Sequence, residues 1–338
     1  MSVRTCVAAI ALLLLVPVQG QQADIRDHPV RRIGTWQADL ARPLDERIGA
    51  APPALVEYLT LDNLKQGYPQ RPRAAVLEPA FVQDVKAAIR ELPPSVWRLF
   101  GERLVGVYFV EELGGTGYTD AVKDSAGKDV AAYIVLDTAV LRPLAANAWA
   151  TWKESSPFKP QPGWTLEARI EGDTGNDRRN AIQYILLHEL GHVLSVGRQL
   201  HPPWDIAPKQ VPARASYPFL EQSWTIDRSA NRYAALADGG FPQRRNVAYY
   251  FGAKLAAADM VPTYEALEKT NFPTLYAATQ PFDDFAESFA SYVHVVLMRR
   301  PWQIVLSQDG KVVKTINHCW DEPRCAAKRR LLEEIVGR

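Results

Sequence analysis

Two histidines and a glutamate stand at a spacing that can bind a metal ion and activate water. His188, Glu189 and His192 lie in the stretch 179–194, whose apolar residues recur at helical intervals. Helix residues four apart share one face, about 6 Å apart along the axis, so both imidazoles can bind one ion. Glu189 would then lie beside the metal, where its carboxylate can take a proton from a bound water. The spacing predicts a catalytic zinc site on a buried helix.

A catalytic zinc site needs a third protein ligand and one position left for water. The remaining histidines are His28, His201, His294 and His318. None of them stands at the offset used in the HExxHxxGxxH motif, so we expect a carboxylate as the third ligand. The candidate segment is 276–292, in which Asp283 and Glu287 lie four apart on a predicted helix that begins at Pro281.

Together, these two stretches resemble the catalytic domain of the anthrax lethal-factor family, a branch of the gluzincin zinc peptidases. The resemblance rests on HExxH at 188–192 and on Tyr276, which stands seven residues before an acid-x-Phe-Ala-Glu-x-Phe helix. It covers 184–194 and 276–289, 25 of the 338 residues. Each stretch is moderately specific, and the pair in this order is more specific than either alone.

The resemblance implies that Asp283 is the third zinc ligand and that Tyr276 hydrogen-bonds the developing oxyanion. It also implies that Glu287 lies outside the ligand set and hydrogen-bonds the second ring nitrogen of His188 or His192. Two departures from the family pattern matter. The family usually has Glu at the position of Asp283, so Glu287 stays open as the alternative zinc ligand, although Asp is a competent one. About 90 residues separate His192 from Asp283, which implies an inserted subregion at about 200–270.

The implied reaction is zinc-dependent hydrolysis of peptide bonds, in which a zinc-bound water attacks and Glu189 is the general base. An extended peptide is expected to pair with the predicted strand 131–136, taken as a sheet edge. Two alternatives stay open. One is an exported zinc-binding module without hydrolytic activity, against which the intact Glu189 argues. The other is a hydrolase of non-peptide amides.

The first twenty residues predict export from the cytoplasm. Arg4 precedes a short apolar run at 7–16, and small residues stand before Gln21, as at a signal-peptidase site. We expect a signal peptide over 1–20, cleavage near Gly20 and a secreted or periplasmic protein; an uncleaved membrane anchor is the alternative. No later run approaches the ~18 apolar residues of a membrane span.

Removal of the signal peptide leaves two cysteines, Cys319 and Cys325. An even pair in an exported protein predicts one disulfide, closing a short loop. The net charge of +1 and the absence of a basic stripe make nucleic acid an unexpected partner. The expected partner is a peptide or protein substrate.

Composition and patterning predict a folded α+β protein. With 47% hydrophobic and 23% charged residues, the chain is not of the disordered class. The Pro- and Arg-rich residues 21–75 are interpreted as an N-terminal extension, and 76–338 as a zincin-like catalytic domain. The expected elements are a helix at 78–91, strands at 104–110 and 131–136, an irregular Trp-rich segment at 149–164, and helices from 178 onward. This order predicts a small sheet followed by a mainly helical C-terminal half.

Overall fold

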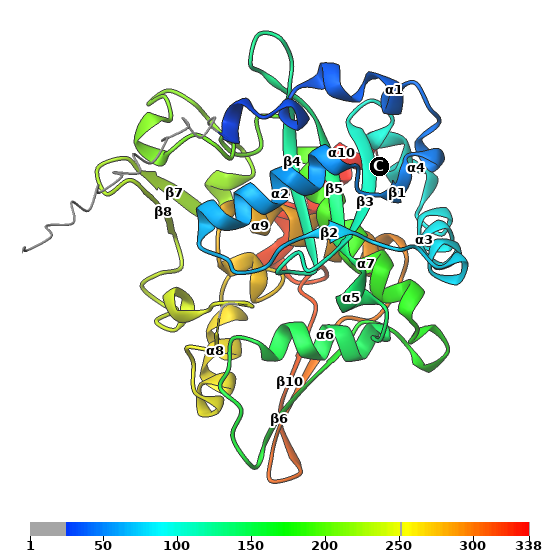
Figure 1. Ribbon diagram of the computed structural model, residues 1–338. Helices are drawn as coiled ribbons and strands as arrows, with labels where there is room; N and C mark the ends of the chain where they lie inside the picture. The colour runs from blue at the N-terminus through cyan, green and yellow to red at the C-terminus, as the bar shows by residue number, and fades with distance from the viewer. Residues whose placement is uncertain (1–24, 251, 338) are drawn as a thin grey trace, which may run out of the picture.

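The computed structural model describes residues 25–250 and 252–337 and has a mixed α/β architecture (Figure 1). The α+β class is therefore confirmed at this coarse level. The expected signal peptide, residues 1–20, lies outside the described residues.

The main sheet has the strand order β1-β3-β5-β4. These strands are β1 (Ile48–Ala50), β3 (Leu104–Glu111), β5 (Asp129–Asp137) and β4 (Gly117–Lys123), and the short β2 (Arg73–Ala74) pairs with β3. β1, β3 and β5 are parallel, and β4 is antiparallel to β5. Because β3 and β5 are buried along most of their length, they read as continuous apolar runs in the sequence. Both predicted strands are confirmed.

The expectation that 131–136 forms a sheet edge is wrong. β5 contains these residues and lies between β3 and β4, so both of its sides are paired. The edge strand on this side of the sheet is β4, whose first residue is Gly117. Strand order depends on contacts between distant segments, so the apolar pattern of one strand cannot reveal it.

Helices cover both faces of the main sheet. On one face lies α2 (Pro53–Gln66), which crosses in front of the strands in Figure 1 and packs through Leu55 and Leu59. On the other face lie α7 (Arg178–Ser195) and α3 (Pro79–Arg90), the second of which confirms the predicted helix at 78–91. The described part of the expected N-terminal extension, 21–75, thus supplies β1, β2 and α2 to the same fold.

The central helix α7 is crossed closely by α9 (Pro281–Tyr292). A Cβ atom added at Gly191 of α7 would lie 2.7 Å from the Cα atom of Ala286 in α9. Only glycine permits this approach, because real Cβ contacts are never so short. The close crossing brings the first turn of α9 to the histidines of α7.

The C-terminal half is less helical than expected. It contains the hairpin of β7 (Trp224–Asp227) and β8 (Arg232–Ala235) and the strands β9 (Gln303–Gln308) and β10 (Lys311–Asn317), which form a second sheet with β6 (Trp164–Arg169). The β7–β8 hairpin and α8 (Met260–Leu267) lie in the expected inserted subregion. The segment 149–164 is irregular only over 156–163, because α6 (Ala146–Ser155) carries Trp149 and Trp152 and β6 begins at Trp164. The remaining helices are α1 (Gln37–Leu40), α4 (Pro94–Trp97), α5 (Thr138–Leu141) and α10 (Ala326–Val336).

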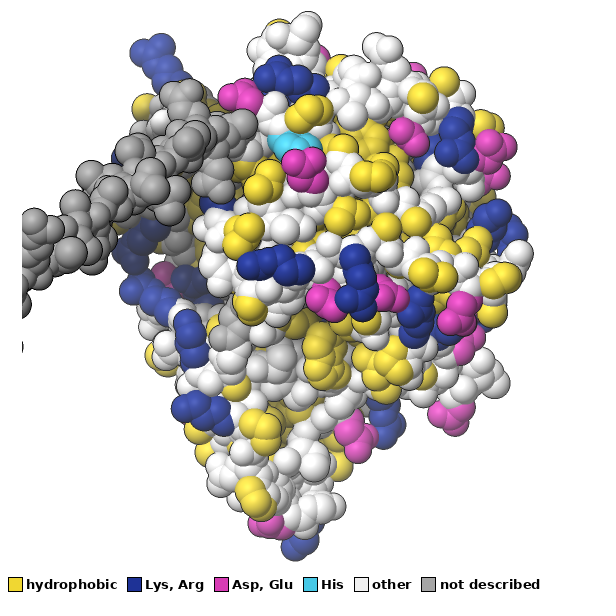
Figure 2. Space-filling view, in the orientation of Figure 1, with side chains coloured by type: hydrophobic (Ala, Val, Ile, Leu, Met, Phe, Trp, Pro, Cys, Tyr) yellow, Lys and Arg dark blue, Asp and Glu magenta, His cyan; other side chains and the backbone are white. Residues whose placement is uncertain are grey.

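Cys319 and Cys325 form a disulfide just before α10, with Cα atoms 5.8 Å apart and both side chains buried. On the face shown in Figure 2, both basic and acidic side chains are scattered over the surface. In the described part of the chain, no helix combines the length and the apolar character needed to cross a membrane.

Candidate metal centre

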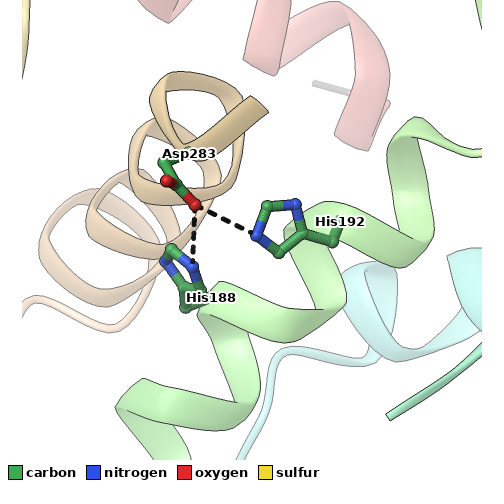
Figure 3. Close-up of side chains that lie close together, drawn as sticks. All are labelled: His188, His192 and Asp283. Carbon is green, nitrogen blue, oxygen red and sulfur yellow. Dashed lines mark ion pairs between the residues drawn. The ribbon is translucent and has the colours of Figure 1, made fainter. Parts of the chain in front are cut away.

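Three side chains from two helices converge on one point (Figure 3). His188 and His192 come from successive turns of α7, and Asp283 comes from the first turn of α9. The Oδ1 atom of Asp283 lies 3.8 Å from Nε2 of His188 and 3.4 Å from Nε2 of His192. The imidazole rings are nearly perpendicular, with centroids 4.9 Å apart. Among the described residues, these three form the one group of such side chains close enough to share a metal ion.

The donor set suits zinc. Around a tetrahedral zinc ion with bonds of ~2.0–2.1 Å, neighbouring ligand atoms stand about 3.3 Å apart. The two distances to Asp283 Oδ1 are close to this value and too long for strong hydrogen bonds. Two imidazoles and one carboxylate leave a fourth position for water or substrate, as in catalytic zinc sites.

Hydrogen bonds fix the orientation of the Asp283 carboxylate. Its second oxygen, Oδ2, accepts hydrogen bonds from the side chains of Gln280 at 2.6 Å and Thr279 at 3.4 Å, leaving Oδ1 directed at the histidines. Burial opposes the charge, but His192 and His188 together lower the pKa of Asp283 below its usual range. The carboxylate is therefore held as an anion, which is the form that binds metals.

The carboxylate of Glu189 rests against the edge strand β4. Thr119 donates a hydrogen bond from Oγ1 to Glu189 Oε2, 2.7 Å away. A Cβ atom added at Gly117 would lie 2.3 Å from Glu189 Oε1, so only glycine leaves room for the carboxylate there. Glu189 is thus held beside the three converging side chains without taking part in their cluster.

Glu287 contacts His188 on the side facing away from Asp283. Its Oε1 atom lies 2.9 Å from Nδ1 of His188, and its Oε2 accepts a hydrogen bond from Thr274 at 2.7 Å. A carboxylate acceptor at Nδ1 places the ring proton there and leaves Nε2 free to bind a metal. Burial alone would raise the pKa of Glu287, but the charge of Lys153 and the hydrogen bond with His188 hold it well below its usual range.

A buried lysine stands behind Glu287. Lys153 Nζ on α6 lies 3.1 Å from Glu287 Oε1 and 3.1 Å from Glu154 Oε1. Burial disfavours the ammonium, but the charges of Glu287 and Glu154 raise the pKa of Lys153 well above its usual value. The lysine is therefore a cation enclosed by the protein.

Tyr276 lies beside the first histidine, with its ring centroid 5.5 Å from that of His188. Burial and the negative charge of Asp283 raise the pKa of Tyr276 well above its ordinary value. The hydroxyl therefore keeps its proton and can donate a hydrogen bond. The side chain also lines the cleft over the metal centre.

The cleft consists of two adjoining hollows of about 480 and 510 Å³. Both are lined by His188, Glu189, Tyr276 and the start of β4. The first extends along β4 toward Asp120 and Trp204, and the second extends toward Trp149 and Tyr250. The candidate metal centre therefore lies in an open cleft that runs along the start of β4.

The structure brings together all six residues expected at this site, which are His188, Glu189, His192, Tyr276, Asp283 and Glu287. Sequence reasoning missed six others that orient them, which are Gly117, Thr119, Lys153, Thr274, Thr279 and Gln280. Gln280 directly precedes the predicted helix and could have been considered as a partner of Asp283. Gly117, Thr119 and Lys153 reach the site through long-range packing and carry no local signal.

No family profile, curated protein or solved structure matches this chain.

Proposed function

We propose that this chain is a zinc-dependent peptidase of the gluzincin type, with a zincin-like arrangement of α7, α9 and β4. The observation that carries the proposal is the convergence of His188, His192 and Asp283 beside Glu189, at the edge strand of the sheet. When bound there, zinc would supply a water of lowered pKa and polarise the scissile carbonyl.

The protein's own groups would perform the proton transfers. Glu189 would take a proton from the attacking water and deliver it to the leaving amine. Tyr276, which keeps its hydroxyl proton and lines the cleft, would donate a hydrogen bond to the developing oxyanion. Glu287 would hold His188 through Nδ1 and keep Nε2 directed at the metal.

A peptide substrate fits the cleft because the cleft runs along β4. The outer side of this strand pairs with the described residues at one position only, where Lys123 forms a bridge with Arg32. The backbone from Gly117 to Ala121, which lines the cleft, would therefore accept an extended chain as an additional strand. Such a chain would cross directly over Glu189, which Gly117 and Thr119 hold. This is support for a peptide over a non-peptide amide, for which a strand edge offers no advantage.

A zinc-binding module without hydrolysis is the rival proposal. A closed site would need a fourth protein ligand, and the metal-binding group of the described residues has three members. A glutamate fixed beside the metal also has no purpose in a purely structural site.

Export to an oxidising compartment belongs to the same proposal, since the buried Cys319–Cys325 disulfide is of the kind found in exported proteins.

The deciding experiment compares the mature protein with Glu189→Gln, which keeps the shape of the side chain and removes the base. We expect one zinc per chain in both proteins, measured by elemental analysis. Cleavage of a peptide library should be lost on chelation and restored by zinc. In Glu189→Gln, cleavage should fall by at least the ~10²–10⁴-fold attributed to a general base. Absence of zinc in the wild type would overturn the proposal. Equal cleavage by both proteins would remove Glu189 from it, and zinc without cleavage of any peptide would favour the binding module.

A further inference from the structure

Lys153 is a buried cation that the reaction proposed above does not use. Its side chain is 5% exposed and lies on α6, a helix that carries no zinc ligand. Taking an ammonium group out of water is costly unless opposite charges and hydrogen bonds surround it closely. The contacts of Lys153 therefore indicate what its burial achieves.

The first contact is an oxygen shared with the metal centre. Oε1 of Glu287 lies 3.1 Å from Lys153 Nζ and 2.9 Å from His188 Nδ1, so one atom joins the lysine to the histidine. The other oxygen of Glu287 is occupied by the hydroxyl of Thr274. With both oxygens bound, the carboxylate has a single orientation, and it presents an acceptor to His188.

The remaining contacts hold Lys153 itself in place. Glu154 Oε1 lies 3.1 Å from Nζ, and Glu154 Oε2 accepts hydrogen bonds from the hydroxyls of Tyr249 and Tyr264. Nζ also lies 4.8 Å from the ring centroid of Tyr276, within the range of a cation–π contact. The same ammonium thus contacts the residue behind His188 and the residue proposed to assist at the oxyanion.

We propose that Lys153 is a positioning residue of the metal centre, which fixes Glu287 against His188 and the Tyr276 ring beside it. This inference rests on the proposed zinc site. A positioning role and a purely electrostatic role of Lys153 predict opposite changes in zinc affinity when the lysine is removed. A nearby positive charge repels zinc, so a lysine that acted only through its charge would weaken zinc binding, and its removal would tighten it. A lysine that positions the ligands strengthens zinc binding, and its removal weakens it.

The test is the zinc affinity of Lys153→Met, measured by competition with a chromophoric chelator. We expect the dissociation constant to rise about tenfold, at the lower end of the ~10–100-fold loss found when a partner of a metal ligand is removed. The chain offers a matched control in Lys328→Met. Lys328 is fully buried, pairs with Asp284 on the same helix α9 and lies over two aromatic rings, but it contacts none of the three proposed ligands. Lys328→Met should lower the melting temperature of the zinc-free protein without changing its zinc affinity beyond about twofold, the scatter expected of such measurements.

A second variant keeps the test open if Lys153→Met does not fold. Lys153→Met with Glu154→Gln removes one cation and one anion together, so no additional unpaired charge is left, and the same tenfold loss is expected. Cobalt substituted for zinc gives a further readout, since its visible absorption bands report ligand geometry. These bands should change in the Lys153 variants and stay unchanged in Lys328→Met. An unchanged or tighter zinc affinity in both Lys153 variants would overturn the inference. Failure of the wild type to bind zinc would instead overturn the proposed function.

Discussion

Thr119 Oγ1 donates a 2.7 Å hydrogen bond to Oε2 of Glu189, so the strand proposed to bind substrate also orients the proposed general base. Thr119→Val keeps the branched shape and removes the donor. Hydrogen bonds to charged groups contribute about 1.5–3 kcal/mol, so we expect kcat to fall about 10–100-fold. Zinc content should not change, because Thr119 contacts none of the three proposed ligands. Thr119→Ser retains the hydroxyl and should stay within a few-fold of the wild type. A wild-type kcat in Thr119→Val would show that the base needs no such support.

A side chain at position 117 should lower the catalytic rate by displacing Glu189. In Gly117→Ala, the new Cβ atom would lie 2.3 Å from Glu189 Oε1 and would push the carboxylate away. Displacements of about 1 Å in a catalytic group can cost roughly 10²-fold in rate, and we expect a loss of that size. Gly115→Ala is the matched control, since the atom nearest to its new Cβ would be a backbone oxygen 3.9 Å away. Steady-state kinetics on both variants, with circular dichroism to establish folding, checks the prediction. Equal losses in the two variants would point to the loop rather than to Glu189.

The parts of the site that the sequence could predict are those with local geometry. His188 and His192 share a helix face because of the helical repeat, and this relationship needs no knowledge of the rest of the fold. Asp283 could be proposed from the family resemblance, but its approach to the histidines depends on the close crossing at Gly191 and Ala286. That crossing involves residues almost a hundred positions apart.

The errors have the same origin. The sequence predicts the strand β5 at the right residues but wrongly at a sheet edge, because the apolar pattern does not reveal which strands lie beside it. Lys153 stands among Trp, Ser and Pro residues in a segment interpreted as irregular. Only the packed structure shows that it is buried against Glu287. Burial of a lysine is unusual enough that no sequence rule would favour it.

The pairing of Asp238 with Arg244 and Arg245, in the segment that follows β8, should make the protein sensitive to acid. Burial alone would raise the pKa of Asp238, but Arg244 and Arg245 hold it below its usual range. Arg244 also donates a hydrogen bond to the carbonyl of Ala278, two residues after Tyr276. A carboxylate with a lowered pKa in the folded state stabilises it above the unfolded pKa of ~3.9, and this contribution is lost as the pH falls through the folded value.

Asp238→Asn tests this linkage. We expect the variant to lose up to about 1 kcal/mol of unfolding free energy at pH 7, the range for ion pairs near the protein surface. The difference between variant and wild type should shrink as the pH falls below about 4, because both then lack the carboxylate charge. Urea unfolding at several pH values measures it. A difference that stays constant down to pH 2 would mean that the charge of Asp238 is not responsible.

The Cys319–Cys325 disulfide should stabilise the C-terminal helix locally. It closes a short loop, since the cysteines are six positions apart, and chain entropy for such a loop amounts to about 2 kcal/mol. We expect Cys319→Ala with Cys325→Ala to lose stability of this order while keeping zinc affinity. In this double variant, hydrogen exchange should show that α10 opens faster than α7. Mass spectrometry of exported protein should find no free thiol at either cysteine, and two free thiols would contradict the prediction.

The assignment of the third ligand can be decided by two variants that differ in kind. Asp283→Ala should empty the site, because His188 and His192 alone hold zinc poorly. Glu287→Gln should retain zinc with an affinity weaker by about 10–100-fold, as expected for a group that supports a ligand. The geometry favours Asp283 as the ligand and Glu287 as the supporting group. Asp283 Oδ1 faces the Nε2 atoms of both histidines, while Glu287 contacts Nδ1 of His188. Both oxygens of Glu287 are also engaged, by His188 and Lys153 on one side and by Thr274 on the other.

The same assignment explains how a short aspartate can serve where the family that the sequence resembles usually has glutamate. The missing methylene requires α9 to lie closer to α7, and Gly191 permits that approach to Ala286. Gly191→Ala should therefore push the helices apart and weaken zinc binding in the wild type. In Asp283→Glu the longer side chain can span the wider gap, so Gly191→Ala should cost that variant less. Zinc affinities of the four proteins in this double-mutant cycle measure the coupling between the two positions. Additive losses would show that the helix crossing does not set the reach of Asp283.

The choice between Asp283 and Glu287 has its own contrary outcome. Zinc lost in Glu287→Gln and kept in Asp283→Ala would place the ligand one helical turn later.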